Sequence, residues 1–455
     1  MEFLLLEKDL SCAYNIFDFV SIVFYYLSEE NTTSLNGKYK KILSSKKYIS
    51  EFIQLEELIN NLFFYEDIDE YYFVEFKNEW INLFKNNKVD CDIYCFETLQ
   101  LFDINYLSYS NALKGNLQEQ GPLNNVFKDK VLFYNVLPSG CLSEYLQNNN
   151  IRKGRRTIVN NPSDLDSKFY NFHIVKTSTL SDFEPRIKKY NKIINVEDYS
   201  LIGIVPTKIH ENIEIKFDTK SELFDIEYKN QNFERHLKYV IDTLVTMDNH
   251  GFKIVIFPEL FLFPDSLEYL RKFLCSNKFN NIELILTGSE WNKNKNSSYI
   301  LSSSGTILNR HNKKIPYDHY CKEKGITYSE NIEIDNTIEF LDIPGIGRIA
   351  YLICRDFLTT TLQNLCFNIM ESNLLCVSAY TSKTDLMLDS SRTSARLYGV
   401  ASILCNSCSA LNDKENLLGY VVVPIVKNKT LSFDELLLSR IESQCTNCNR
   451  CFIIN

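Results

Sequence analysis

The chain has 455 residues, 45% of them hydrophobic and 24% charged, with a formal net charge of −9 at pH 7. Such a composition is typical of globular proteins, and the length is enough for two or three domains. The acidic balance argues against nucleic-acid binding through net charge, and the scarcity of glycine and proline argues against extensive disorder.

The beginning of the sequence and its hydropathy argue against secretion and membrane insertion. The first residues, MEFLLLEKDL, carry an acidic residue where a secretion signal carries basic ones, and their apolar run is too short. No stretch approaches the roughly eighteen apolar residues that a membrane span needs. Fourteen cysteines without a secretion signal therefore predict a cytoplasmic protein with reduced thiols.

Residues 1–190 are predicted to form a mainly helical domain. Apolar side chains recur at helical spacing over 49–65 and 73–87, with charged residues between them. The basic run IRKGRR at 151–156 could contact a phosphate backbone or an acidic partner, or could be a solvated loop. No catalytic pattern occurs in this part. We expect it to recruit a protein partner or to build an oligomer, because aromatic-rich amphipathic helices must pack on something.

Residues 195–455 are predicted to form an α/β domain. An amphipathic helix over 230–251 ends at a glycine, and residues 297–310 are typical of a β-hairpin around Ser304-Gly305. Near-continuous apolar strands that alternate with helices indicate sheets covered on both faces. The expected strands are 199–209, 252–260, 282–290, 347–356 and 373–380.

Three residues with useful chemistry follow predicted strands. Glu259 comes directly after an apolar strand in IVIFPELF, Lys314 follows the hairpin in NRHNKKIPYD, and Cys354 ends the strand in LICRDF. Because functional sites in α/β folds form at strand ends, we expect these three side chains to meet in one pocket.

These residues, in this order, resemble the nitrilase or carbon–nitrogen hydrolase superfamily. In that family a Glu follows an apolar strand in a Phe-Pro-Glu setting, a Lys follows a Gly-centred hairpin, and a Cys ends an apolar strand, often as Cys-x-Asp. The resemblance covers residues 198–455. It implies a four-layer α-β-β-α sandwich, catalysis by Glu259, Lys314 and Cys354, and association into a homo-oligomer.

Further landmarks are similar to those of the same family. The stretch TGSEWNKNKNSSYILSSSGTILNRHNKK resembles its Gly-Ser strand, its Asn-Ser pair and its hairpin, and Asn406 stands at the position of the family's Asn. A second glutamate often assists in this family before the cysteine strand. Glu330 in YSEN matches that setting, and Glu323 is the second choice.

The chemistry of these residues is consistent with hydrolysis of a C–N bond. A thiol near pKa 8.5 is mostly protonated at neutral pH and needs a base, which Glu259 can supply. Lys314 can stabilise the oxyanion, and a thioester on Cys354 would then be hydrolysed with help from Glu330. The reaction needs no metal or organic cofactor.

Two residues beside the proposed triad leave alternatives open. Arg355 follows the nucleophile, where it could bind an acidic substrate group or only pair with Asp356. Lys313 precedes Lys314 and could be the catalytic lysine instead, although the spacing to Glu330 favours Lys314.

The remaining cysteines raise the question of a structural zinc site. CNSC and CTNCNRC contain Cys-x-x-Cys pairs, which are typical of zinc knuckles. Alternation along the preceding strand places at least one residue of the first pair in the core. The zinc candidates are Cys408, Cys445, Cys448 and Cys451, and the alternative is that these thiols are simply reduced.

The sequence therefore supports two hypotheses. The first is a thiol-dependent amidohydrolase, of amidase or nitrilase type, that acts on a small-molecule amide or nitrile. The second is a nitrilase-like interaction subunit of a larger assembly, such as an antiviral system with a reverse transcriptase on a separate chain. The intact Glu, Lys and Cys favour the first hypothesis, and the extra helical domain favours the second.

Overall fold

The computed structural model describes most of the chain. The chain divides into two compact units, one of Met1–Asn116, Gln120–Ser139 and Arg156–Glu184, the other of Leu117–Glu119, Gly140–Arg155 and Pro185–Asn455. The described residues are 3–13, 16–28, 46–64, 70–86, 90–112, 118–120, 126–127, 130–131, 134–138, 172–176, 183–190, 192–194, 201–207, 212–410, 417–426 and 433–442.

The first unit is built around a helical core of aromatic side chains. Phe19 makes edge contacts with Phe76 and Trp80, and the Trp80 indole donates a 2.9 Å hydrogen bond to Thr98 Oγ1. The polar end of the indole is therefore satisfied although the ring is fully buried. The helices are α1 (Phe3–Leu10), α2 (Ile16–Ser28), α4 (Lys46–Phe64), α5 (Glu70–Asn86) and α6 (Cys91–Ala112).

The helical part is shorter than the sequence indicated. The predicted helices over 49–65 and 73–87 are confirmed as α4 and α5, but the described residues between 118 and 189 form strands. Their sequences, such as YNVLP and FHIVK, are rich in aromatic and β-branched residues, which favour strands. These strands are β1 (Gln118–Gln120), β2 (Val126–Phe127), β3 (Lys130–Val131), β4 (Tyr134–Pro138), β5 (Phe172–Lys176) and β6 (Glu184–Lys189).

The second unit contains a five-stranded sheet with the order β13-β12-β11-β10-β7. The strands β7, β10 and β11 are parallel, while β11, β12 and β13 are antiparallel neighbours. The hairpin expected around Ser304-Gly305 is confirmed as β12 and β13. The bounds are β7 (Ile202–Ile204), β10 (Ile254–Ile256), β11 (Leu284–Asn292), β12 (Lys295–Ser302) and β13 (Ile307–Asn312).

An eight-stranded sheet has the order β1-β6-β16-β17-β18-β19-β20-β21. Its central strands β17, β18 and β19 are parallel, and every residue in them is buried. The sheet includes β6, so it extends to residues before the expected domain start at 195. The other bounds are β16 (Thr337–Ile343), β17 (Gly347–Ile353), β18 (Leu374–Ala379), β19 (Ala401–Asn406), β20 (Leu417–Val426) and β21 (Phe433–Glu442).

One buried cluster joins these two sheets. Ile254 and Ile256 of β10 share it with Tyr351 of β17 and Cys405 of β19, whereas Val255 belongs to a second cluster with α9 and α10. This alternation is the two-residue period of a strand that is buried on both faces. The cluster between the sheets explains why Cys405 is a core residue, as the sequence predicted.

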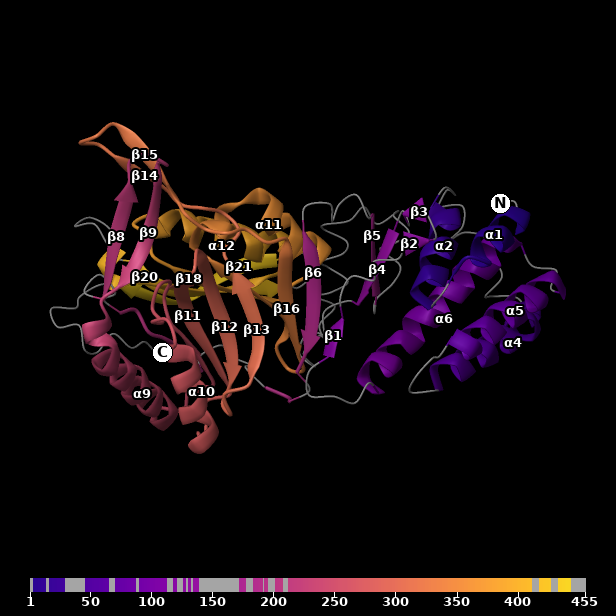
Figure 1. Ribbon diagram of the computed structural model, residues 1–455. Helices are drawn as coiled ribbons and strands as arrows, with labels where there is room; N and C mark the ends of the chain where they lie inside the picture. The colour runs from indigo at the N-terminus through magenta and orange to yellow at the C-terminus, as the bar shows by residue number, and fades with distance from the viewer. Residues whose placement is uncertain are drawn as a thin grey trace. The chain divides into compact units, whose positions relative to one another are not determined.

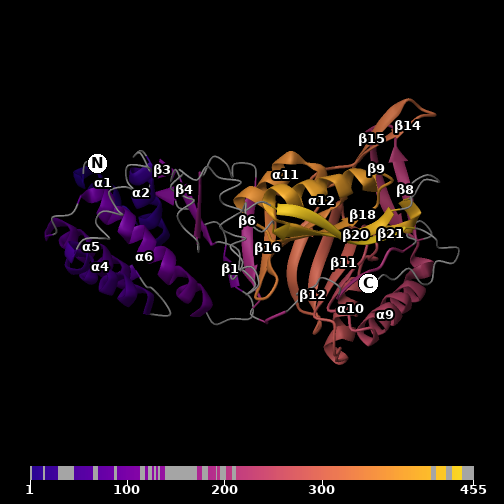
Figure 2. The same cartoon turned by 180° about the vertical axis from the view of Figure 1, so that it is seen from behind.

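Helices flank the two sheets (Figures 1 and 2). The predicted helix over 230–251 is confirmed as α9, which packs with α10 against the outer face of the five-stranded sheet. The helices α11 and α12 lie on the side of the eight-stranded sheet. Their bounds are α9 (Phe233–Asn249), α10 (Ser266–Ser276), α11 (Thr360–Asn364) and α12 (Thr384–Tyr398), with short turns η3 (Asn230–Asn232), η4 (Cys354–Leu358), η5 (Leu365–Ile369) and η6 (Cys408–Ala410).

A four-stranded sheet with the order β14-β15-β9-β8 was not expected from the sequence. The hairpin of β8 (Ile213–Asp218) and β9 (Leu223–Tyr228) lies between β7 and α9 in the chain, and β9 pairs in parallel with β15 (Ile326–Glu330). The edge strand β14 (Asp318–Cys321) completes the sheet. Over the described ranges, no helix has the length and apolarity that a membrane crossing requires.

Candidate functional site

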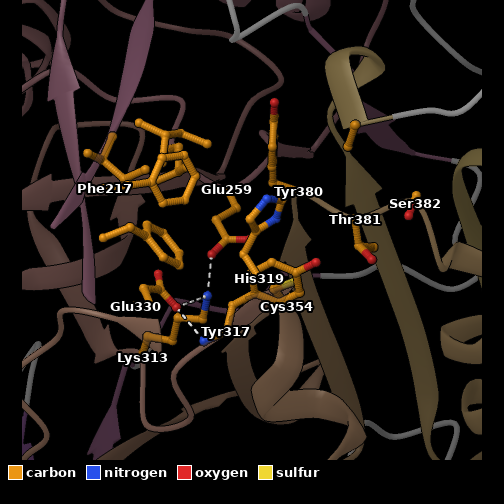
Figure 3. Close-up of a pocket in the computed structure, with 15 residues that line it drawn as sticks. Phe217, Glu259, Lys313, Tyr317, His319, Glu330, Cys354, Tyr380, Thr381 and Ser382 are labelled. Atoms are coloured by element: carbon orange, nitrogen blue, oxygen red, sulfur yellow. Dashed lines mark hydrogen bonds and ion pairs between the residues drawn. The ribbon is translucent and has the colours of Figure 1, made fainter. Parts of the chain in front are cut away.

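A pocket of about 230 Å³ opens in the second unit, and Cys354, Glu259, Lys313 and Glu330 line it together (Figure 3). These four residues come from four different strands or strand ends. All four are buried, with at most 5% of each residue exposed. The pocket therefore gathers a thiol, an ammonium group and two carboxylates in a region of low solvent access.

Cys354 is the first residue after β17 and the first of the turn η4. Its φ of +48° lies in the left-handed region, which a non-glycine residue adopts at a cost of about 1–3 kcal/mol. The strained turn follows a strand in which every residue is buried, so the backbone at Cys354 is held firmly. The Cys354 thiol lies close to the Glu259 carboxylate and to the backbone N–H of Tyr380, and both influence the pKa of the thiol.

Glu259 lies just beyond β10 in a segment that packs on a bulge of β11. The Leu260 N–H donates to Ser289 Oγ at 2.9 Å, and the Glu259 N–H donates to the Ala379 carbonyl at 3.4 Å. Gly288 has a φ of +72°, and a Cβ there would lie 2.1 Å from the Pro258 carbonyl oxygen. Only glycine therefore lets this segment approach β11 closely enough to place Glu259 in the pocket.

The Lys313 ammonium lies between the two carboxylates. Its Nζ is 2.8 Å from Glu259 Oε1 and 2.7 Å from Glu330 Oε2. Glu330 also accepts the backbone N–H of Tyr317 at 2.9 Å, which fixes its carboxylate at the end of β15. Figure 3 shows this network beside Cys354.

Asn296 is a member of the site that the sequence analysis did not assign a role. Its side-chain amide donates to Glu259 Oε1 at 2.9 Å and to Glu330 Oε1 at 3.3 Å. Its backbone carbonyl accepts the N–H of Lys313 at 2.8 Å. The sequence did contain a signal for this residue, the Asn-Ser pair before the hairpin. Only the pairing of β12 with β13 places the Asn296 amide between both glutamates.

The structure places Lys313 in the pocket and Lys314, the lysine that the sequence favoured, outside it. Lys314 Nζ pairs with Asp335, and Lys314 is not among the residues that line the pocket. The two lysines follow β13 in an extended segment, where neighbouring side chains point to opposite sides. The backbone N–H of Lys313 bonds back to β12, while that of Lys314 bonds to Asp356 in η4.

Arg355 does not face the pocket. Its Nη1 donates to the Pro316 carbonyl at 2.7 Å and to Asp318 Oδ2 at 2.6 Å, so its partner is Asp318 and not Asp356. The expectation that Arg355 binds an acidic substrate group therefore finds no support in this geometry. The second-choice glutamate, Glu323, lies exposed in the turn between β14 and β15.

Asn406 supports the loop that follows β18 and lines the pocket. Its Oδ1 accepts the Thr381 N–H at 3.0 Å, and its Nδ2 donates to the Thr381 carbonyl at 2.8 Å. Thr381 and the adjacent Ser382 both line the pocket. The residue singled out in the sequence thus lies behind the pocket wall and not in the pocket itself.

Burial sets the protonation of the site. Burial raises the pKa of Glu259, and Glu330 raises it further, although Lys313 opposes both effects. Burial also raises the pKa of the Cys354 thiol, and the Glu259 carboxylate adds to the shift. Burial alone would lower the pKa of Lys313, but the charges of Glu259, Glu330 and Cys354 outweigh it and hold that pKa well above its usual value. At neutral pH the site therefore holds a protonated thiol, a charged lysine and a carboxylate that binds a proton readily.

The zinc candidates stay largely untested. Within the ranges that the structure describes, no group of three or more His, Cys, Asp or Glu side chains could hold a metal ion. Cys408 is half-buried in η6, where its N–H donates to the Thr207 carbonyl at 3.1 Å. Cys445, Cys448 and Cys451 lie outside the described residues.

Comparison with known proteins gives matches among solved structures only. No family model and no curated protein matches the chain. The chain is similar to a glutamine-dependent NAD⁺ synthetase from Acinetobacter baumannii, at 12% identity and a TM-score of 0.36, over 53% of this chain and 43% of that one. It is also similar to an amidase of the nitrilase superfamily from Nesterenkonia, at 13% identity and a TM-score of 0.35, over 53% of this chain and 89% of that one.

A third similar structure is the NitFhit protein of C. elegans, at 16% identity and a TM-score of 0.36. The match covers 53% of this chain and 60% of that protein. Both the synthetase and the worm protein are thus matched over less than two thirds of their length, so their activities as whole proteins are not transferred to this chain.

Proposed function

We propose that this protein is a thiol amidohydrolase that cleaves a non-peptide C–N bond through a thioester on Cys354. The observation that carries the proposal is that Cys354 and Glu259 line one pocket with Lys313, whose Nζ lies 2.8 Å from Glu259 Oε1. A nucleophile, a base and a cation in hydrogen-bond reach are what acyl transfer requires.

In the first half of the reaction, the Cys354 sulfur attacks the carbonyl carbon while its proton passes to Glu259. The negative charge moves to the carbonyl oxygen. Bonds to Glu259 and Glu330 use two of the three ammonium N–H groups of Lys313, so the third can donate to this oxyanion. The intermediate collapses when the C–N bond breaks, and the leaving nitrogen takes the proton from Glu259. The products of this half are an amine or ammonia and the thioester.

In the second half, water attacks the thioester and gives its proton to Glu259. The C–S bond breaks, the sulfur recovers its proton from Glu259, and the carboxylic acid leaves. The raised pKa of Glu259 makes its carboxylate a stronger base than an exposed one, which suits it to this repeated uptake and release of a proton. The two halves of the reaction balance without a redox partner or a group carrier.

Glu330 and Asn296 act as positioning residues in this proposal. Glu330 holds Lys313 from the side opposite Glu259, and Asn296 donates to both carboxylates. We further propose that the two sheets and their flanking helices form the four-layer α-β-β-α sandwich of the nitrilase superfamily. The shared cluster between the sheets and the packing of α9 and α10 support this assignment.

The test is to trap the acyl-enzyme. Incubation of the full chain with p-nitrophenyl acetate, followed by acid quenching and peptide mass spectrometry, should give an acetyl group on Cys354. Cys354→Ala should remove that group with a loss of only about 1 kcal/mol in stability, because alanine keeps most of the buried volume. Cys275→Ala is the matched control, since Cys275 is an exposed cysteine outside the pocket. Equal acetylation of Cys275 and Cys354 would mean that the pocket confers no reactivity.

The second candidate function, an interaction subunit of a larger assembly, is favoured by one observation. The helical unit has its own buried core of more than twenty residues, separate from both clusters of the α/β unit. All residues that line the pocket lie between 215 and 410, so that helical core contributes none of them. A protein that binds a partner but never acylates Cys354 would fit this second function.

A further inference from the structure

One wall of the pocket is built by the unexpected β8–β9 hairpin. Ile215 and Phe217 of β8 and Phe224 and Ile226 of β9 all line the pocket. They form two directly opposed cross-strand pairs, Ile215 with Ile226 and Phe217 with Phe224. Residues two apart on a strand and directly opposite on its neighbour share one face of the sheet. Four apolar side chains are therefore presented together toward the pocket.

Two of these side chains are partly exposed to solvent. Ile215 is 39% exposed and Phe217 is 41% exposed, whereas Phe224 and Ile226 are each 6% exposed. Exposed apolar area costs roughly 25 cal/mol per Å² relative to burial, so a bound apolar group that covers Ile215 and Phe217 would gain free energy.

The apolar wall is joined directly to the reacting groups. Glu330 of β15 lies opposite Phe224 of β9 in the parallel register, and the N–H of Asn331 donates to the Phe224 carbonyl at 3.0 Å. The same sheet thus carries both the wall and the carboxylate that holds Lys313. A group bound against these apolar side chains therefore lies next to the reacting groups. Figure 3 shows Phe217 and Glu330 on one side of Cys354 and Thr381 and Ser382 on the other.

The cations around the pocket are already paired. Lys313 is shared by two carboxylates, Lys314 pairs with Asp335, and Arg355 pairs with Asp318. Of the described residues that line the pocket, Lys313 is the one lysine or arginine, and two carboxylates already share it. His319 lines the exposed edge of the pocket, where its ring lies against Phe217. An acidic substrate group would therefore lack an unpaired lysine or arginine beside the apolar wall. A cationic group would lose its hydration against the isoleucine and phenylalanine side chains, which is costly. The carboxylates of the pocket, Glu259 and Glu330, already bind Lys313 and Asn296.

The volume limits the size of the substrate. The pocket holds about 230 Å³, which is below the ~300–1,000 Å³ typical of pockets for drug-sized ligands. A compact amide fits within this space, whereas a peptide or a large cofactor-like molecule would extend beyond it into solvent.

We propose that the pocket takes a small amide whose acyl side chain is uncharged and apolar, with that side chain against Ile215, Phe217, Phe224 and Ile226 and its carbonyl carbon at Cys354. The inference rests on the proposed function, because it names the substrate class of the same site. Phe217 is then a specificity-determining residue: it touches the substrate side chain but takes no part in proton transfer.

The first experiment measures binding without turnover. The full-length Cys354→Ala protein is titrated by calorimetry with phenylacetamide, succinamic acid and 5-aminopentanamide, which carry an apolar, an acidic and a basic side chain. Phenylacetamide should bind at least tenfold more tightly than either charged amide. A second substitution, Phe217→Ala, in the Cys354→Ala protein should weaken phenylacetamide binding by about fivefold to tenfold, because the ligand loses its contact with the Phe217 ring. Tyr269→Ala is the matched control, since Tyr269 is an aromatic side chain that is 55% exposed on α10 and does not line the pocket.

The inference is overturned if a charged amide binds as tightly as phenylacetamide, if none of the three binds, or if Phe217→Ala has no larger effect than Tyr269→Ala.

A second measurement separates the inference about the substrate class from the proposed function. Wild-type protein is treated with p-nitrophenyl phenylacetate and Cys354 is checked for the phenylacetyl group. Preferred binding of phenylacetamide without acylation of Cys354 would contradict the proposed hydrolase function but support the apolar substrate class. Acylation with preferred binding of a charged amide would refute the substrate class and leave the hydrolase.

Discussion

His311 Nε2 lies 2.7 Å from Asp356 Oδ2, and both side chains are fully buried. The other oxygen of Asp356 accepts the backbone N–H groups of Lys314 at 3.0 Å and Ile315 at 2.8 Å. Since Asp356 lies two residues after Cys354, one carboxylate ties the turn that carries the thiol to the strand end that carries Lys313. The distance between nucleophile and cation is therefore set by Asp356.

Asp356→Ala should lower the free energy of unfolding by about 3 kcal/mol or more and should also slow acylation of Cys354. The substitution leaves the buried N–H of Lys314, the half-buried N–H of Ile315 and the buried His311 imidazole without their acceptor. Urea denaturation and the p-nitrophenyl acetate assay measure the two effects. Asp318→Ala is the control, because its pair with Arg355 is more than 40% exposed on both sides and should contribute little. An Asp356→Ala protein as stable as the control would contradict the role assigned to this carboxylate.

Lys313→Gln should reduce the rate of Cys354 acylation by about 100-fold or more, while Lys314→Gln should change it by less than about threefold. Only Lys313 lies in the pocket, and loss of an oxyanion donor typically costs about 10²–10³ in rate. The single-turnover release of p-nitrophenol measures both variants. Because Lys313→Gln removes a buried charge between two carboxylates, its thermal unfolding is followed in parallel, and Lys313→Arg should recover part of the lost stability. A larger loss of rate in Lys314→Gln than in Lys313→Gln would return the assignment to Lys314.

Stability should fall as the pH is lowered from 6.5 to 4 because of His236 on α9. Burial lowers the pKa of this histidine to about 4, against an ordinary value of 6.5. Its folded-state pKa is depressed, so the unfolded chain takes up the proton first. The contribution is fully present above pH 6.5 and decreases by about 3 kcal/mol as the pH falls through this window. Urea denaturation from pH 7.5 to pH 4 should show a shallower slope for His236→Phe than for wild type. Identical slopes would mean that His236 does not account for the loss.

The helical unit should be dispensable for acylation but not for assembly. A chain that begins at residue 183 keeps β6 and every residue that lines the pocket, and of the eight-stranded sheet it loses only the edge strand β1. We expect it to acylate Cys354 at the rate of the full chain, while light scattering shows a homo-oligomer for the full chain and a smaller species for the shortened one. Circular dichroism checks that the shortened chain is folded. A folded, normally assembled protein that has lost acylation would instead assign the helical unit as a lid over the pocket.

Much of the α/β unit could be predicted from local sequence. The runs that form β10, β17 and β18 are continuously apolar, and all three strands are fully buried. Glu259 and Cys354 could be singled out because each is a chemically reactive residue that directly follows such an apolar run. The hairpin of β12 and β13 was equally local, because a turn sequence between two apolar segments specifies it.

The place of the β8–β9 hairpin in the fold could not be predicted in the same way. The sequence of β8 is IEIKFD, in which apolar Ile213, Ile215 and Phe217 alternate with charged residues. This is the two-residue pattern of a half-buried strand, and the sequence analysis did not use it. What makes it a wall of the pocket is the parallel pairing of β9 with β15, more than a hundred residues later in the chain. Pairing across such a distance depends on the whole fold and leaves little trace in the local sequence.

The sequence by itself indicated the strands β7, β10, β11, β12, β13, β17 and β18 of the second unit, and that a glutamate, a lysine and a cysteine would follow such strands. Only the tertiary structure decided which lysine serves the pocket. Lys313 and Lys314 are chemically identical neighbours, and spacing to Glu330 could not separate them. The register of β12 with β13 directs the Lys313 N–H to Asn296, and the buried carboxylate of Asp356 takes the N–H of Lys314. Successive residues of an extended chain face opposite ways, so these two backbone bonds place Lys313 between the glutamates and send Lys314 to Asp335.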